Sequence, residues 1–74
     1  MTAKTPLDEQ IERFEKAAAE LELAMKHAKT SAQHLRDKEM ARAWAHGFAI
    51  HGHMVRAKKL MDEIADDHAT HAIP

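Results

Sequence analysis

Seven histidines in 74 residues are the side chains of this sequence best suited to chemistry. Three of them, His46, His51 and His53, lie in the short segment AWAHGFAIHGHM. Imidazole binds divalent metals, but two ligands on one helix share a face only at spacings of three or four residues. Here the spacings are five and two. These histidines therefore converge on a metal only if the chain turns at Gly52.

A second group of candidate ligands lies near the C-terminus, where carboxylates and imidazoles recur at helical spacing. The group consists of Glu63, Asp67, His68 and His71. Such side chains hold zinc or another divalent ion when a neighbouring chain supplies further ligands. One chain does not offer a complete ligand set at motif spacing. We therefore expect a solvated helix end here and no cofactor.

Side chains for covalent catalysis are scarce. Cysteine and tyrosine are absent, and the single serine, Ser31, lies in a segment typical of a helix cap. No glycine-rich loop is present to hold a phosphate. A small helical domain also offers little room for a substrate pocket. We expect no enzymatic activity.

The composition predicts an all-α protein, because Ala, Glu, Lys, Leu and Met dominate and β-branched and aromatic residues are few. We expect a single helical domain over residues 1–74, with residues 1–5 and 72–74 disordered. Thr5 is a typical N-cap, Pro6 suits the first helical position, and Asp8 and Glu9 favour the positive end of the helix dipole. The first helix should therefore begin at residue 6.

Two stripes of apolar residues recur at alternating steps of three and four, the heptad pattern of helices that pack on other helices. The first stripe is Leu7, Ile11, Phe14, Ala18, Leu21, Met25 and Ala28. The second is Met40, Ala43, Gly47, Ile50, Met54, Ala57, Met61 and Ile64. We expect these stripes to form the helix contacts of a small antiparallel bundle.

The helix boundaries in this bundle allow two architectures. Residues 30–33, TSAQ, match a capping box, and Gly52 is suited to end a helix in the left-handed conformation. These signals predict three helices, at about 6–29, 31–51 and 54–70. The alternative extends the first helix to about Arg36, with Asp37 capping the next. Periodicity also accepts a two-helix hairpin with one long second helix, which would dimerise to cover its apolar residues.

The preferred turn at Gly52 rests on a resemblance. Residues 38–69 resemble one tetratricopeptide-type helix hairpin, with an aromatic residue at Phe48, glycine at Gly52, and the small residues Ala45 and Ala57 where the two helices of that motif approach closely. The resemblance implies a helix pair that folds back at residues 51–53. It implies no tetratricopeptide function, because one such unit cannot bury its own apolar face.

An aromatic stripe accompanies the second apolar stripe. It consists of Trp44, Phe48, His51 and Val55, beside Met54 and Met61. Trp44 either fills the core of a three-helix bundle or anchors an interface, because buried aromatic residues often dominate binding energy. These six residues are the predicted interaction surface.

Charge is distributed unevenly although the formal net charge is -1. The middle of the chain is basic and its C-terminal end is acidic. The basic residues of the middle region are Arg36, Lys38, Arg42, Arg56, Lys58 and Lys59. On one face they would meet nucleic-acid phosphates, but the near-neutral charge and the lack of a recognition helix argue against it.

These observations favour a non-enzymatic helical module for protein–protein interaction, acting as an adaptor, assembly factor or small inhibitor. We expect it to form a homo-oligomer, a dimer or higher, and to bind a protein partner that the sequence does not identify. The alternatives are a nucleic-acid-binding hairpin and a histidine-rich metal-binding protein. No apolar run is long enough for a membrane span, and the lack of cysteine fits the cytoplasm.

Overall fold

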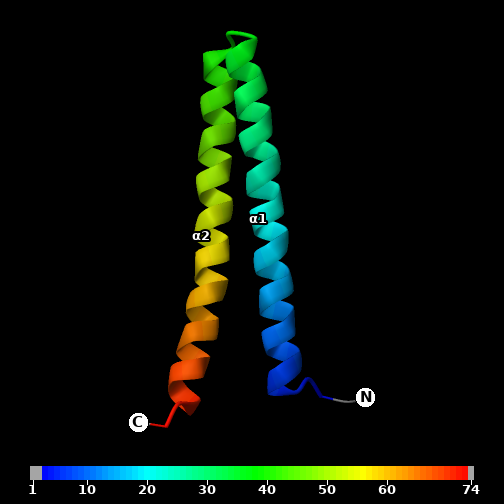
Figure 1. Cartoon of the computed structure of the whole chain (residues 1–74), viewed down its shortest axis with the longest axis vertical. Helices are drawn as coiled ribbons and strands as arrows, with labels where there is room; N and C mark the ends of the chain where they lie inside the picture. Colours follow the sequence, from blue (N-terminus) through cyan, green and yellow to red (C-terminus); the bar gives the residue numbers. More distant parts are fainter. Residues whose placement is uncertain (1–2, 74) are drawn as a thin grey trace.

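The computed structural model describes residues 3–73, which form two α-helices and no strand. α1 spans Pro6–Arg36 and α2 spans Met40–His71. The helices lie side by side in an antiparallel hairpin, with both chain ends at the end opposite the turn (Figure 1). The predicted all-α class is confirmed. The three-helix bundle is wrong, and the two-helix hairpin fits.

The first helix begins where the sequence predicts. The Thr5 hydroxyl accepts a hydrogen bond from the Asp8 backbone N–H, and the Thr5 N–H donates to the Asp8 carboxylate, both at 3.1 Å. This capping box satisfies donors that a helix start leaves free. The hydrogen bond from the Thr5 N–H holds the pKa of Asp8 below its ordinary value. Residues 1, 2 and 74, predicted to be disordered, lie outside the described residues.

The predicted break at Thr30 is wrong, because α1 continues to Arg36. The hydroxyls that indicated a cap have other partners. Thr30 donates to the Lys26 carbonyl at 3.1 Å, one helical turn earlier. Ser31 donates across the hairpin to the Ala43 carbonyl at 3.0 Å. Serine and threonine make such backbone bonds inside helices as well as at their ends, so the motif did not mark a boundary.

The turn between the helices is three residues long. Lys38 has a positive φ of 62°, the left-handed conformation. Its N–H donates to the Leu35 carbonyl at 3.0 Å, and the Glu39 N–H donates to the His34 carbonyl at 2.8 Å. This pair of bonds is a Schellman motif, which closes the last carbonyls of a helix. Asp37 is therefore the C-cap of α1 rather than the N-cap of α2.

No turn occurs at Gly52, which lies inside α2 and has no positive φ. The predicted third helix and the tetratricopeptide-like fold-back are therefore wrong. A first helix ending at about residue 29 would have covered little more than half of a long second helix. α1 has 31 residues and α2 has 32, so the two helices match in length.

We predict that Gly52→Ala stabilises the protein. A Cβ added at Gly52 meets nothing within 4 Å. Alanine in a helix interior is favoured over glycine by about 0.8–1.0 kcal/mol. Urea denaturation followed by circular dichroism should therefore show a higher midpoint for the variant. A left-handed turn at this position would give a lower midpoint instead.

The contact between α1 and α2 is made mainly by small and polar side chains, together with Ile50, Leu60 and Ile64 of α2. In the described residues, the buried positions are Ala17, Ala24, Ala43 and Ala57. They belong to two lines of residues at heptad spacing that face each other, here called the contact lines. The contact line of α1 is Gln10, Arg13, Ala17, Glu20, Ala24, His27, Ser31 and His34. That of α2 is Ala43, His46, Ile50, His53, Ala57, Leu60, Ile64 and Asp67.

The contact lines differ from the predicted apolar stripes. The whole α1 stripe is exposed and lies one residue further round the helix than the contact line. Of the α2 stripe, Ala43, Ile50, Ala57 and Ile64 face α1, whereas Met40, Met54 and Met61 are exposed. Ala17 and Ala24 are seven residues apart on α1, and Ala43 and Ala57 are fourteen apart on α2, and these small side chains leave room for a close approach of the two backbones. Most of the bulky apolar residues consequently have no partner within the hairpin.

The hairpin is a single layer. Its principal extents are 53 × 34 × 12 Å, and the smallest equals roughly the 10–12 Å diameter of one helix. The radius of gyration is 17.0 Å, against about 11 Å for a compact domain of this length. Folded domains normally bury a core between two packed layers. Both broad faces of this hairpin are instead open.

Candidate interaction surface

One broad face of the hairpin carries large apolar side chains along its whole length. We call it the apolar face and define it by ten residues, each 46–69% exposed. They are Leu7, Ile11, Phe14, Leu21, Met25 and Leu35 from α1 with Met40, Trp44, Met54 and Met61 from α2. A monomeric protein rarely exposes so many large apolar side chains on one face, and such faces mark interaction sites.

Both helices contribute to the same face because they run antiparallel. Leu21 and Met54 each follow a contact-line residue, so both are rotated to the same side of the layer. Shallow pockets on this side are lined from both helices. Leu35 and Trp44 share one of them, and Leu7 and His68 share another.

All six predicted interaction residues lie on the exposed surface. Trp44 is 64% exposed, so the interpretation of Trp44 as core is wrong for the hairpin. Trp44, Met54 and Met61 belong to the apolar face. His51 lines a pocket with Trp44 and Phe48. Phe48 and Val55 lie further round α2, and Phe48 is 80% exposed.

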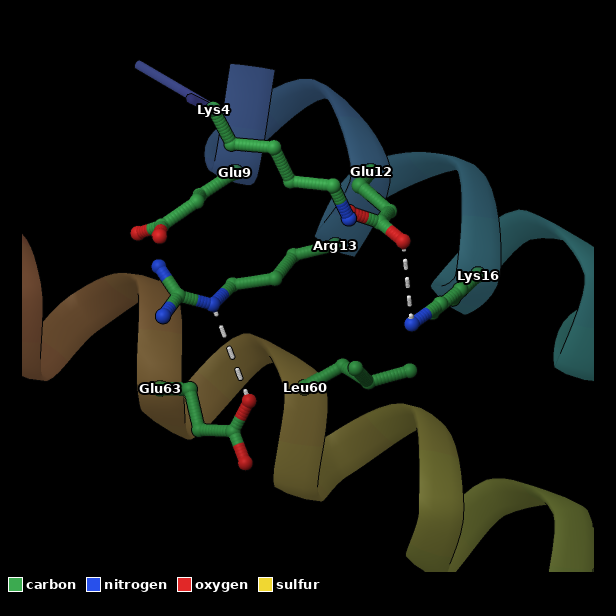
Figure 2. A pocket seen from close by; sticks show the side chains of 7 residues that line it. All are labelled: Lys4, Glu9, Glu12, Arg13, Lys16, Leu60 and Glu63. Carbon is green, nitrogen blue, oxygen red and sulfur yellow. Dashed lines mark hydrogen bonds and ion pairs between the residues drawn. The ribbon is translucent and has the colours of Figure 1, made fainter. Parts of the chain in front are cut away.

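The opposite broad face is polar. Figure 2 shows a hollow on this side, lined by Lys4, Glu9, Glu12, Arg13, Lys16, Leu60 and Glu63. Glu12 bonds Lys4 at 2.6 Å and Lys16 at 3.3 Å. The hydrogen bond between Lys4 and Glu12 raises the pKa of the lysine and lowers that of the carboxyl. The charged side chains keep this face hydrated. The two broad faces therefore differ sharply in polarity.

The predicted basic patch does not form one continuous surface. Arg36 and Lys38 lie at the turn, and the other four lie along α2. Lys59 is three residues from Arg56 and shares its side of α2, whereas Lys58, two residues from Arg56, points to another side. Three of the six pair with carboxylates: Arg42 with Glu39 at 3.2 Å, Arg56 with Glu20 at 3.9 Å and Lys58 with Asp62 at 2.7 Å.

The four candidate ligands near the C-terminus do not gather round a point. Glu63 contacts Arg13 at 3.7 Å on the polar face. Asp67 accepts a hydrogen bond from Gln10, while the His71 ring bonds the Asp67 backbone carbonyl at 2.9 Å. His68 lies on the side of the apolar face. Within residues 3–73, no three histidine or carboxylate side chains are arranged to hold one metal ion.

Four other histidines do come together, between the helices. His27 and His34 of α1 alternate with His46 and His53 of α2, and we call this set the histidine ladder. The Nδ1 atoms of His27 and His46 are 2.8 Å apart. The His27 ring stacks on His53 and the His46 ring on His34, each with centroids 5.3 Å apart.

Sequence reasoning missed the ladder, although a signal for it exists. His27 and His34 are seven residues apart, and so are His46 and His53. A seven-residue spacing places two side chains on the same face of a packed helix. Proximity in the chain instead groups His46 and His53 with His51. In the structure His51 is exposed on a different side of α2.

Comparison with protein-family models, curated proteins and solved structures finds no match for this chain. Its function must therefore be argued from its own surface. Neither α1 nor α2, which cover most of the described residues, is long and apolar enough to cross a membrane.

Proposed function

We propose that this chain is a non-enzymatic helical module for protein–protein interaction, and that its first partner is a second copy of itself. The apolar face is the contact surface. The observation that carries the proposal is the row of ten large apolar side chains, each about half exposed or more, on one side of a single-layer hairpin. Two such layers stacked face to face make a four-helix bundle with an apolar core.

The exposed area has the size that a stable dimer needs. The chain has 6147 Å² of accessible surface. A compact monomer of its 8.4 kDa mass is expected to expose about 4600 Å². The excess, about 1500 Å² per chain, exceeds the roughly 800 Å² that each partner buries in a standard interface. Counted over both chains, this excess area falls in the range of the area buried by obligate homodimers.

A protein partner has room on this assembly. Stacking through the apolar face leaves the outer side of α2 accessible, where Phe48 and Val55 lie. We place the complex in the cytoplasm, which agrees with a chain that contains no cysteine.

The test is the mass in solution, by sedimentation equilibrium at micromolar concentration. We expect twice the chain mass, because the hairpin alone leaves its apolar face in water. A monomer over the whole concentration range would refute the proposal. So would a chain that forms a stable complex only with a different protein seated on this face.

Trp44→Ala tests the same surface by removing its largest side chain. Trp44 is exposed in the isolated hairpin, so the variant should keep its helical circular dichroism. Aromatic residues at interfaces often contribute about 2 kcal/mol or more, so we expect the dimer to weaken by at least about tenfold. Leu23→Ala is the control, because Leu23 is 41% exposed but lies outside the apolar face. Loss of helix in Trp44→Ala at neutral pH would instead show that the tryptophan supports the hairpin itself.

A further inference from the structure

The histidine ladder forms a continuous file of four rings inside the contact between α1 and α2. In spatial order the rings are His53, His27, His46 and His34. Consecutive ring centroids are 5.1–5.3 Å apart. Rings from both helices alternate along the file, so its contacts hold the two helices together.

A carboxylate lies at each end of the file. His53 Nδ1 is 2.6 Å from Glu20 Oε2, and His34 Nδ1 is 3.0 Å from Glu39 Oε2. Each of these carboxylates also has an arginine nearby. Arg56 Nη1 is 3.9 Å from Glu20, and Arg42 Nη1 is 3.2 Å from Glu39. The Nδ1 atom of each end histidine thus lies within hydrogen-bond distance of a carboxylate, and the arginine near that carboxylate offsets part of its negative charge.

Within residues 3–73, the central pair, His27 and His46, has no carboxylate partner. At 2.8 Å, the His27 and His46 Nδ1 atoms are bonded only if one donates its proton and the other accepts with its lone pair. The donor ring tolerates a further proton on its Nε2 atom. The acceptor ring does not take a proton on Nδ1, because two N–H groups would then point at each other. The closed pair therefore holds one positive charge at most.

We propose that the histidine ladder is a pH switch that opens the hairpin in mild acid. The separated helices bind two extra protons on His27 and His46, whereas the closed hairpin binds one. Stability falls as pH falls wherever the open state binds more protons. Histidine is the side chain whose charge ordinarily changes between about pH 5 and 8. The second proton on the central pair is the one that separates the helices.

Opening has a consequence for the apolar face, and this step rests on the proposed function. Residues from both helices make up that face, so separation of α1 from α2 divides it. The second copy is then released in acid.

The first test compares urea midpoints at pH 7.5 and pH 5.0 by circular dichroism for the full chain and two variants. His46→Gln removes the second protonation site of the central pair. His71→Gln removes a histidine outside the ladder, at the end of the same helix, whose side chain is 75% exposed. We expect the midpoint of the original chain to drop in acid, His46→Gln to lose at least half of that drop, and His71→Gln to keep it. The full drop in His46→Gln would overturn the proposal.

The second test needs no variant, in case His46→Gln does not fold. Nuclear magnetic resonance of the imidazole nitrogens follows each histidine through the titration. We expect His27 and His46 to take up protons in two separate steps, the second together with loss of helix contact. Uptake in one step, alongside His71 and with the hairpin intact at pH 5.0, would overturn the switch. A parallel mass measurement keeps the two proposals apart, because a monomer with two-step uptake contradicts only the dimer.

Discussion

Leu21→Glu is expected to convert the proposed dimer into a monomer. Leu21 lies near the middle of the α1 part of the apolar face and is 53% exposed in the hairpin. In a face-to-face dimer this position becomes buried, and an unpaired carboxylate is unfavourable there because it loses its water. We expect the dimer to weaken by at least about a hundredfold, equivalent to about 2.7 kcal/mol. Sedimentation equilibrium measures the change directly.

Leu23→Glu is the matched control for this experiment. It places the same charge only two residues away on the same helix, at a position that is 41% exposed but not on the apolar face. Its mass should remain that of the original chain. If both variants dissociate, the dimer uses another surface. If neither does, the apolar face is not the interface.

Ala57→Leu is expected to cause a large loss of stability within the hairpin itself. Ala57 is 5% exposed and lies on the contact line of α2, where alanine permits close approach of the helices. Extra methylene groups in such a contact cost about 1–3 kcal/mol. A domain of this length has a total stability of roughly 4–11 kcal/mol, so a substantial fraction would be lost. The urea midpoint should fall accordingly.

Ala45→Leu is the companion variant for Ala57→Leu. Ala45 is exposed on the same helix, and leucine and alanine have similar helix propensities, so we expect a change within about 0.5 kcal/mol. An Ala57→Leu protein as stable as the Ala45→Leu protein would contradict the contact lines described here. It would show that α2 packs against another element through a different side.

The helices and the start of α1 were predictable because their signals are local. Thr5, Pro6 and Asp8 form a cap from residues adjacent in sequence, and the structure contains that cap. The signals that set the end of α1 were not local in this sense. The Ser31 hydroxyl bonds Ala43 of the other helix, and the positive φ of Lys38 belongs to a residue type with no preference for that conformation. Neither signal can be recognised without the partner segment.

The exposed surface was predicted in part. Heptad spacing identified the bulky apolar residues, and it was natural to pair these stripes with each other inside one chain. Each helix, however, carries two stripes at heptad spacing, and the bulky apolar residues of α2 are divided between them. Periodicity does not say which stripe meets which partner. That choice depends on the backbone approach that Ala17, Ala24, Ala43 and Ala57 allow, a property of both helices together.

Because the hairpin is only 12 Å thick, the stability of its folded state should depend on the concentration of the chain. If half of the apolar core comes from another molecule, mass action governs folding, and the melting temperature rises with protein concentration. At low expression a larger fraction of the chains would be unassembled and open to proteases. The amount of the chain that a cell makes would then set how long each copy survives.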